Sequence, residues 1–450
     1  MTGIVRVSLW GTCVGYLGYA PGQTETASFE FDEAFARSGI QLSPIVMRCP
    51  PRLHSFPDIS SWTFKGLPGI FADSLPDSFG EKLIDLYMAE RGVPNGRITA
   101  LDRLLYVGKR GMGGFEYEPS REFEDGEGPD LALDVRSLGE IAGMVAARDD
   151  ARRRALLDSG AARDAIRLIR VGSSAGGARA KALVSRRDDG TFVDGTLAGE
   201  GSDAGSIAGT NTGALSHWLL KFDVGSNADR DGMDPKGMTR VEYVYSIIAR
   251  ECGIDMPETD GIEDGDDFHF LVRRFDRETE GAKTRKLHYS SWAALSHADR
   301  DATGSHSYEE LVLLARNLGL GQDAVTEIFR RAAFNVVGRN QDDHTKNFAF
   351  LMDRAGSWKL SPAFDLTWSF DPAGRWTRVH QIRLNGKQDY FTRDDLLAFG
   401  RYCNLDAKKA GRLLDASLDA FSAFPRLAAQ YGVPEPLSHR IRETQRLYLT

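Results

Sequence analysis

The sequence is poor in cysteine and has no apolar stretch long enough for a transmembrane helix. Its four cysteines form no Cys-x-x-Cys pair and are widely spaced, at Cys13, Cys49, Cys252 and Cys403. Such a pattern is typical of unpaired thiols in a reducing compartment, so we expect a cytoplasmic protein without a disulfide framework. No apolar segment stands near the N-terminus, so neither export nor a membrane partner is predicted.

An excess of basic residues is also missing. The chain has 56 Lys and Arg against 64 Asp and Glu, for a formal net charge of −8. Nonspecific nucleic-acid binding depends on basic surface, so this chain alone is predicted to bind DNA poorly. No internal repeat is visible. The length of 450 residues indicates two or three domains, and a hydrophobic share of 42% is enough for a sizeable core.

The most informative segment is Asn-Gln-Asp-Asp-His-Thr-Lys-Asn at residues 340–347. Asp342 and Asn347 have the spacing of the catalytic base and a metal ligand in a kinase catalytic loop. Residues 348–351 indicate a short buried strand. Asp365 follows in Ser-Pro-Ala-Phe-Asp-Leu, where a second metal-binding carboxylate belongs. We therefore predict Asp342 as a base that accepts a hydroxyl proton, and Asn347 and Asp365 as oxygen ligands of Mg²⁺.

The upstream sequence offers a phosphate-binding loop and a lysine. Residues 169–184 form a glycine-rich turn between two apolar runs, and glycine lets backbone N–H groups approach phosphate oxygens. Residues 218–222 indicate an apolar strand that carries Lys221, which we predict to pair with the α- and β-phosphates. A solvated turn is an alternative for an isolated Asp-x-His sequence, but these upstream elements favour the phosphotransfer interpretation.

Two further segments complete the order of elements found in kinases. Residues 241–251 have helical periodicity, and Glu242 or Glu251 is a candidate partner of Lys221. Residues 269–276 indicate a strand that runs into a hinge. The resulting order is glycine-rich loop, lysine strand, helix, hinge strand, catalytic loop and metal carboxylate.

Helical periodicity is clearest in the second half of the chain. Helices are expected at 79–91 and 134–157, and after about residue 285 at 309–318, 322–337, 392–399, 407–430 and 436–448. The tryptophans in this half fit packing better than a ligand platform: Trp292, Trp358, Trp368 and Trp376.

These segments resemble the HipA family, the serine/threonine kinases of bacterial toxin–antitoxin modules. The Asp-x-His-x-Lys-Asn-Phe string at 342–348 is highly specific for that family. The N-terminal part resembles the family too, so that the resemblance covers nearly the whole chain. The matching segments are 5–18, the Gly-Leu-Pro…Leu-Pro-Asp segment at 64–77, 104–114, 174–181, 219–222, 272–277 and 360–365.

The resemblance implies an α+β, bilobal fold of the protein-kinase type. A β-rich N-terminal subdomain would occupy 1–119, and an N-lobe with the phosphate loop and ATP lysine would occupy 134–285. A mostly α-helical C-terminal lobe would occupy 286–450.

Carried over position by position, the resemblance implies Asp342 as catalytic base, with His344 and Lys346 near the γ-phosphate. The cofactors would be ATP and Mg²⁺. The implied ATP-binding residues are Ser173, Ser174, Gly176, Gly177, Ala178, Arg179, Lys181, Lys221, Arg273 and Phe275. A serine of this loop is autophosphorylated in the family, and Ser174 is the best positional match, with Ser173 adjacent.

The chain departs from the family at Ala180, where proline is usual, and at Arg273, where an acidic residue is common, so adenine contacts there are expected from the main chain. The absence of Asp-Phe-Gly disfavours a conventional eukaryotic-type kinase. The roles of His380 and Lys387 stay open.

The resemblance implies a protein substrate, such as an aminoacyl-tRNA synthetase, and a small helix-turn-helix antitoxin through which DNA is reached indirectly. Two alternatives remain. Small-molecule kinases of the aminoglycoside type also use Asp-x-His-x-x-Asn, which Asp342, His344 and Asn347 satisfy. A non-catalytic co-repressor is the second, although the intact Lys221 and Asp365 argue against it.

Overall fold

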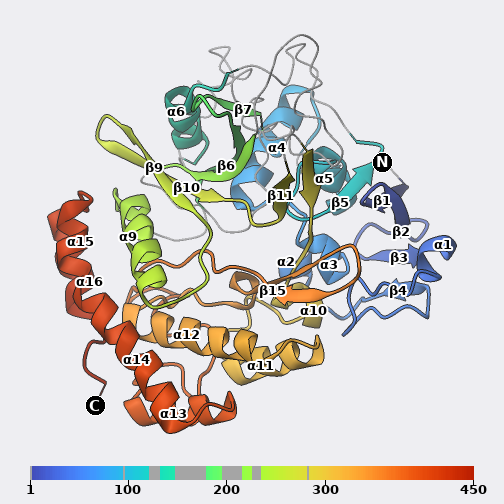
Figure 1. Ribbon diagram of the computed structural model, residues 1–450. Helices are drawn as coiled ribbons and strands as arrows, with labels where there is room; N and C mark the ends of the chain where they lie inside the picture. Colours follow the sequence, from blue (N-terminus) through green and yellow to red (C-terminus); the bar gives the residue numbers. More distant parts are fainter. Residues whose placement is uncertain are drawn as a thin grey trace. The chain divides into compact units, whose positions relative to one another are not determined.

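The computed structural model describes residues 3–94, 97–120, 132–146, 179–194, 215–224, 235–280 and 283–449. Helices and sheets are mixed in these residues, which confirms the α+β class (Figure 1). The chain divides into two compact units. Unit 1 consists of Met1–Asp234, Ile262–Ser290 and Met352–Ser357, and unit 2 of Pro235–Gly261, Ser291–Leu351 and Trp358–Thr450. Neither unit is continuous in sequence, and the division at 1–119, 134–285 and 286–450 stays a prediction.

Unit 1 begins with a five-stranded sheet in the order β4-β3-β2-β1-β5. Its neighbouring strands are antiparallel, and apolar residues alternate along β1, where Val5, Val7 and Leu9 are buried. The strands are β1 (Ile4–Leu9), β2 (Thr12–Tyr19), β3 (Ala27–Phe31), β4 (Leu53–Ser55) and β5 (Phe115–Glu118). Helix α1 (Glu33–Ala36) follows β3.

The Gly-Leu-Pro segment packs two short helices on this sheet, α2 (Ser61–Phe64) and α3 (Gly69–Ala72). The ring of Phe71 in α3 lies 4.5 Å from that of Phe29 and 5.2 Å from that of Phe115. Gly66 lies between α2 and α3 with a φ of +75°, and a Cβ there would overlap the carbonyl of Glu25. Both the dihedral and the close approach require glycine.

A second sheet has the order β7-β6-β8-β10-β9. Its strands are β6 (Lys181–Arg186), β7 (Phe192–Asp194), β8 (Ser216–Lys221), β9 (Thr259–Asp264) and β10 (Asp267–Arg273). The predicted lysine strand and hinge strand are therefore both strands of this sheet. The hairpin β11 (Arg277–Glu280) and β12 (Lys283–Lys286) follows, and then β13 (His288–Ser291).

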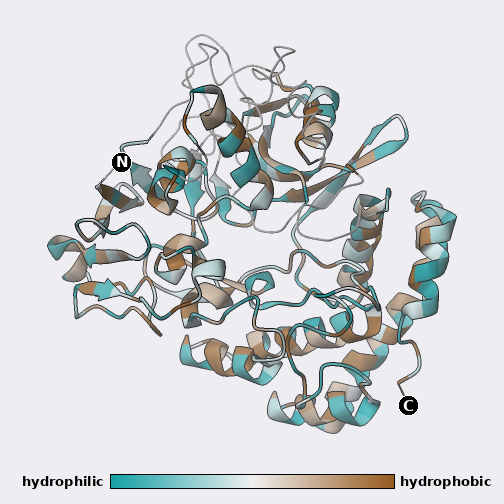
Figure 2. Ribbon diagram, turned by 180° about the vertical axis from the view of Figure 1, so that it is seen from behind, coloured by the Kyte–Doolittle hydropathy of each residue, from teal (hydrophilic) through white to brown (hydrophobic). Residues whose placement is uncertain are grey.

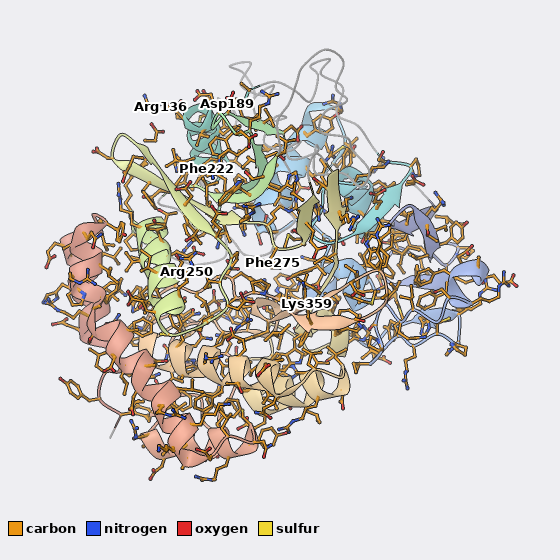
Figure 3. The ribbon with its side chains drawn as sticks, in the orientation of Figure 1. Arg136, Asp189, Phe222, Arg250, Phe275 and Lys359 are labelled. Atoms are coloured by element: carbon orange, nitrogen blue, oxygen red, sulfur yellow. The ribbon has the colours of Figure 1, made fainter. Side chains whose placement is uncertain are left out.

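Three helices of unit 1 share a hydrophobic cluster with β6 and β8: α4 (Ser78–Glu90), α5 (Ala100–Val107) and α6 (Val135–Ala146). Trp218, Leu220 and Phe222 contribute from the sheet side, and Phe79 and Leu83 from α4. The side chain of Phe222 can be followed beside the strands in Figure 3. The N-terminal sequence and the lysine strand are thus parts of one core.

Unit 2 is mostly α-helical, as predicted. Its helices are α9 (Met238–Glu251), α10 (Trp292–Ser296), α11 (Tyr308–Asn317), α12 (Gln322–Gly338), α13 (Arg393–Tyr402), α14 (Ala407–Ser422), α15 (Phe424–Gln430) and α16 (Glu435–Thr444). The strands β14 (Ala349–Met352) and β15 (Trp358–Leu360) are neighbours. Trp292 and Trp368 are buried in its core, which confirms their predicted packing role. Figure 2 shows that its helices carry both hydrophobic and hydrophilic residues, as amphipathic helices do.

Two predicted helices in this unit were wrong in extent. The helix expected at 407–430 is interrupted, because α14 ends at Ser422 and α15 starts at Phe424. Pro425 stands in the first turn of α15, where it has no N–H to donate to the preceding turn. The helix expected to reach residue 448 ends at Thr444. Within the described residues, no helix is long and apolar enough to cross a membrane.

Candidate active site

The predicted catalytic loop lies in unit 2, between α12 and β14. Helix α12 ends at Gly338, and Arg339 follows in the left-handed conformation with a φ of 57°. The loop then forms a 3-10 turn at Thr345–Asn347 before β14 begins. Asn347 Nδ2 donates to the main-chain oxygen of Asp342 at 2.7 Å. The structure therefore brings the predicted base and the predicted metal ligand together.

His344 lies among the other predicted site residues. Burial lowers the pKa of His344, while the carboxylates of Asp342 and Asp365 raise it and the cations of Arg300 and Lys346 lower it further. Three of the charges that act on the imidazole belong to predicted site residues, namely Asp342, Asp365 and Lys346. The net lowering favours a neutral ring. Its Nδ1 is buried and has no hydrogen-bond partner among the described residues.

Asp365 lies in a segment that is hydrogen-bonded to α12. Arg331 of α12 donates from Nη2 to the Ser361 carbonyl at 2.8 Å and from Nε to Glu327 at 2.9 Å. Asp365 itself has a φ of 54°, a left-handed conformation that aspartate tolerates better than most residues. One helix therefore supports both the catalytic loop and the segment with the second carboxylate.

Asn347 in this loop and Asp365 after β15 carry the oxygen atoms that the predicted magnesium site needs. Because Asn347 Nδ2 is held on the Asp342 carbonyl, Oδ1 is the atom of that amide left for a ligand. Amide and carboxylate oxygens are the ligands that Mg²⁺ prefers, and phosphotransferases usually hold it with one or two carboxylates and the substrate phosphates. No group of three His, Cys, Asp or Glu gathers for a metal within the residues described. Asn347 and Asp365 stay the predicted ligands of the ion.

The predicted ATP lysine lies in unit 1. In the antiparallel pair of β6 and β8, Lys181 is directly opposite Lys221, and both lysines are buried. Lys181 Nζ lies 2.9 Å from Asp77 Oδ2, and Asp77 also caps α4 by accepting from Gly80 N at 2.8 Å. Like charges at directly opposite positions repel, so the buried carboxylate of Asp77 stabilises this arrangement.

Sequence reasoning missed the role of Asp77. The only signal was its place at the end of the Leu-Pro-Asp string, which marks an N-cap rather than a partner for a distant lysine.

Part of the predicted nucleotide site lies outside the described residues: Ser173, Ser174, Gly176, Gly177 and Ala178. Lys181 is the first residue of β6, and Arg179 lies two residues before the strand. Glu242 and Glu251 are in α9 of unit 2, whereas Lys221 is in unit 1, so their pairing stays a prediction.

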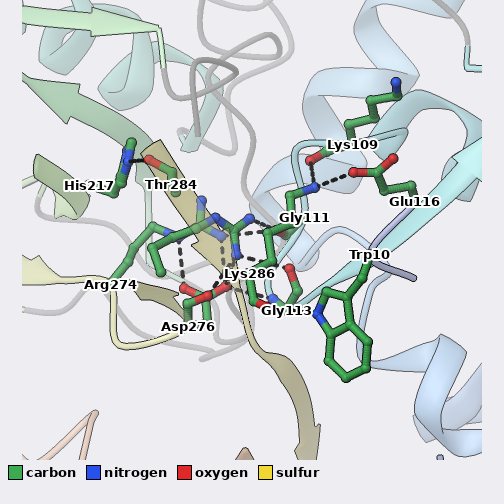
Figure 4. Close-up of polar contacts among 11 residues, drawn as sticks. Trp10, Lys109, Gly111, Gly113, Glu116, His217, Arg274, Asp276, Thr284 and Lys286 are labelled. Carbon is green, nitrogen blue, oxygen red and sulfur yellow. Dashed lines mark hydrogen bonds and ion pairs between the residues drawn. The ribbon is translucent and has the colours of Figure 1, made fainter. Parts of the chain in front are cut away.

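The predicted hinge continues β10 into a buried cluster of charges (Figure 4). Arg273 is exposed at the end of β10. The ring of Phe275, which is labelled in Figure 3, has its centroid 6.3 Å from that of Tyr289. Asp276 is fully buried and accepts from Arg274 Nη2 at 2.8 Å and from Arg277 Nη1 at 2.6 Å. Burial raises the pKa of Asp276, but the two arginines outweigh burial and hold it well below its usual value.

This cluster ties the hinge to the glycine loop before β5. Arg274 and Arg277 both donate to the Gly111 carbonyl at 3.0 Å, and Gly113 N donates to Asp276 at 2.6 Å. Nearby, Lys286 Nζ lies 2.7 Å from Glu116 Oε1, and burial lowers the pKa of Lys286 to about 8. The sequence showed both segments as motifs but gave no sign that they meet.

Comparisons with known proteins identify two family domains in this chain. Residues 5–118 match the HipA N-terminal domain, and residues 173–424 match the HipA-like C-terminal domain. The chain is 30% identical over 146 residues to the Sinorhizobium fredii protein Y4dM, a match that covers 29% of this chain and 34% of that protein. It is 28% identical over 139 residues to a Haemophilus influenzae protein, covering 28% of this chain and 39% of the relative.

Both relatives are named as proposed kinases, and the matched part spans little more than a third of their length. The fold is similar to a chain of the solved HipA, HipB and operator DNA complex of the Shewanella oneidensis MR-1 toxin–antitoxin system. The TM-score is 0.62 at 15% identity, and the match covers 98% of this chain and 94% of that one. At this identity the likeness shows a common fold. With both family domains present over most of its length, the chain belongs to the HipA family.

Proposed function

We propose that the chain is an ATP- and Mg²⁺-dependent protein serine/threonine kinase that transfers the γ-phosphate of ATP to a hydroxyl of a cellular protein. The observation that supports this most is the bond of 2.7 Å from Asn347 Nδ2 to the Asp342 carbonyl. It brings Asn347, the proposed metal ligand, against Asp342, the proposed base, and these are the two roles that a kinase catalytic loop combines. Membership of the HipA family supports the same activity.

In this mechanism the chain orients groups and moves one proton. Asp342 accepts the proton of the attacking hydroxyl. Mg²⁺, when bound, neutralises phosphate oxygens, and Asn347 Oδ1 and the Asp365 carboxylate would hold it. The neutral His344 adds no positive charge, so Lys346 supplies the local cation for the γ-phosphate. In unit 1, Lys221 would pair with the α- and β-phosphates.

The test is Asp342→Asn, which removes the base but retains the shape of the side chain. We expect transfer of ³²P from ATP to fall about 10²–10⁴-fold, the usual contribution of a general base, while nucleotide affinity persists. The matched control is Asp323→Asn, an exposed carboxylate in the first turn of α12. Transfer by Asp342→Asn at the level of the control would contradict the assignment. Transfer to an aminoglycoside but to no protein would favour the small-molecule kinase instead.

The proposed physiological role is that of a toxin with a small helix-turn-helix antitoxin as partner. The solved complex with a similar fold contains HipA, HipB and operator DNA, which supports such a partner for this chain. The net charge of −8 agrees with DNA contact through that partner rather than directly. We expect a short helix-turn-helix reading frame beside this gene, and co-expression with it should yield a complex that binds operator DNA, whereas this chain alone should not.

We also predict that the kinase phosphorylates Ser174, or else the adjacent Ser173, and thereby inhibits itself. Phosphoserine carries about −1.5 to −2 charges, which would repel the phosphates of ATP in a loop that binds them. After incubation with Mg-ATP, mass spectrometry should find the modification in this loop, and the modified fraction should bind nucleotide more weakly than Ser174→Ala treated in the same way. Modified protein with full ATP affinity would rule out the switch.

A further inference from the structure

The residue after the predicted base is the centre of a buried hydrogen-bond network. Asp343 is almost fully buried, and three donors converge on its carboxylate. Tyr308 OH lies 2.9 Å from Oδ2, His380 Nδ1 lies 2.8 Å from the same oxygen, and the main-chain N of Gln381 lies 2.8 Å from Oδ1. A buried carboxylate with three donors has a fixed position.

The geometry also fixes the tautomer of His380. Its Nε2 lies 3.1 Å from Arg446 Nη1, and a guanidinium can only donate. Nε2 must therefore carry the lone pair, and Nδ1 must carry the hydrogen that it donates to Asp343. The ring is completely buried, with its centroid 5.2 Å from that of Phe391 in an edge-on contact. His380 is thus held neutral between a carboxylate and a guanidinium.

The charges around the ring agree with this state. Burial lowers the pKa of His380, Asp343 raises it, and Arg446 and Arg339 lower it further, with a net lowering. Asp389 pairs with Arg446 and lies 3.5 Å from Arg339. Burial and the Asp343 carboxylate also raise the pKa of Tyr308 well above its usual value, so its hydroxyl stays protonated and donates.

Arg446 connects this network to the end of the described chain. It follows α16, and its main-chain N donates to the Val337 carbonyl at 2.9 Å. Its Nη1 also donates to the Val336 carbonyl at 3.2 Å. The C-terminal segment is therefore fastened to the last turn of α12, immediately before the catalytic loop. Through Arg446, His380 and Asp343, it is connected to the main chain of Asp342.

We propose that His380 is a positioning residue for phosphoryl transfer, which holds Asp342 in place through Asp343 and is itself held in the Nδ1–H tautomer by Arg446. The inference rests on the proposed kinase function. Asp343 is bonded to Asp342 through one peptide unit, so a shift of the Asp343 side chain moves the base. A misplacement of a reacting group by about 1 Å costs about 10²-fold in rate.

Kinetics of His380→Ala test the positioning role. We expect kcat to fall about 10–100-fold, as when a supporting partner of a site is lost, with KM for ATP near wild type. His380→Asn is the conservative variant, because its amide N–H can reach Asp343, and it should recover part of this loss. His439→Asn is the matched control, a half-exposed histidine on α16 that pairs with Glu443. Tyr308→Phe removes one donor without changing the packing volume and should lower kcat in the same sense.

The pH profile separates positioning from a merely structural role. Arg446→Met removes a positive charge that repels a protonated His380, so His380 should protonate at higher pH. The acidic limb of the kcat profile should then lie at higher pH than in wild type. ¹⁵N-histidine spectra of wild type should show a protonated Nδ1 and an unprotonated Nε2, in a signal that disappears in His380→Asn. An Nε2–H ring, an unshifted acidic limb, or His380→Ala with the kcat of His439→Asn would each overturn the proposal.

Wild-type protein that transfers no phosphate would contradict the proposed function alone. The ring-nitrogen spectra of wild type and Arg446→Met would then still decide whether Arg446 and Asp343 hold the tautomer.

Discussion

At the scale of single residues, Asp365 combines a charge with an uncommon backbone. Its φ of 54° is a conformation that Asn and Asp adopt far more readily than Ala. Asp365→Asn therefore removes the charge without adding backbone strain, whereas Asp365→Ala does both. We expect both variants to need at least about tenfold more Mg²⁺ for half-maximal nucleotide binding, because a carboxylate ligand is lost.

Only the alanine variant should also lose stability, by about 1 kcal/mol or more from the strained residue. Magnesium titrations monitored by a fluorescent nucleotide, together with urea unfolding, separate the two effects. Unchanged magnesium dependence in Asp365→Asn would show that another group is the second carboxylate.

The predictability of the site also differs from residue to residue. Asp342 and Asn347 were predictable because one short loop contains both, and its spacing sets their geometry. Asp343 was not, because its donors Tyr308, His380 and Gln381 are 35, 37 and 38 residues away with no periodic relation. The partner of Lys181 was missed for the same reason, since Asp77 lies in a different motif.

At the scale of elements, the contact between α12 and α14 positions the catalytic loop (Figure 1). Gly338 is the last residue of α12, and a Cβ there would overlap the ring of Phe421 in α14. That ring cannot retreat, because Phe334 and Tyr245 lie 4.8 and 5.3 Å from it. We expect Gly338→Ala to destabilise unit 2 by about 1–3 kcal/mol through overpacking, and to lower transfer because the loop begins two residues later.

Gly411→Ala is the matched control in α14. Its Cβ would meet only the end of Arg393 at 3.6 Å, and its backbone is helical. Replacing glycine inside a helix should leave stability unchanged or raise it by up to about 1 kcal/mol. Thermal unfolding of the two variants would show whether a Cβ at residue 338 destabilises the fold. Equal melting temperatures would mean that the Phe421 ring can move.

Helix existence was easier to predict from the sequence than helix ends. The apolar period gave α11 and α12 because it persists over several turns of an amphipathic helix. The same period continues from α14 through α15, so periodicity alone did not reveal the break that Pro425 imposes. The α16 helix ends at Thr444 because the chain turns there to place Arg446 on α12, a tertiary contact with no local signal.

At the scale of the whole molecule, histidines that folding buries should make stability depend on pH. Burial, together with the positive charges of Arg274 and Arg277, lowers the pKa of His217 to about 3. Burial also lowers the pKa values of His288 and His297 to about 4. His217 bonds to Ser185 at 2.9 Å and to Thr284 at 2.8 Å, and His288 Nε2 lies 3.3 Å from the Leu42 carbonyl. All three are therefore neutral in the folded chain at neutral pH.

The sign follows from proton uptake. Below the unfolded pKa of about 6.5 the unfolded chain binds protons at these histidines and the folded chain does not. The free energy of unfolding therefore decreases as the pH is lowered. Each group should remove about 1.4 kcal/mol per pH unit between about pH 6.5 and its folded pKa. Urea unfolding at about pH 7.5, 6 and 5 should show this decline, and His288→Gln, which can still donate to Leu42, should reduce its slope by one histidine's share. If His288→Gln lost stability with the wild-type slope, the neutral state of His288 in the fold would be wrong, and burial would not govern its protonation.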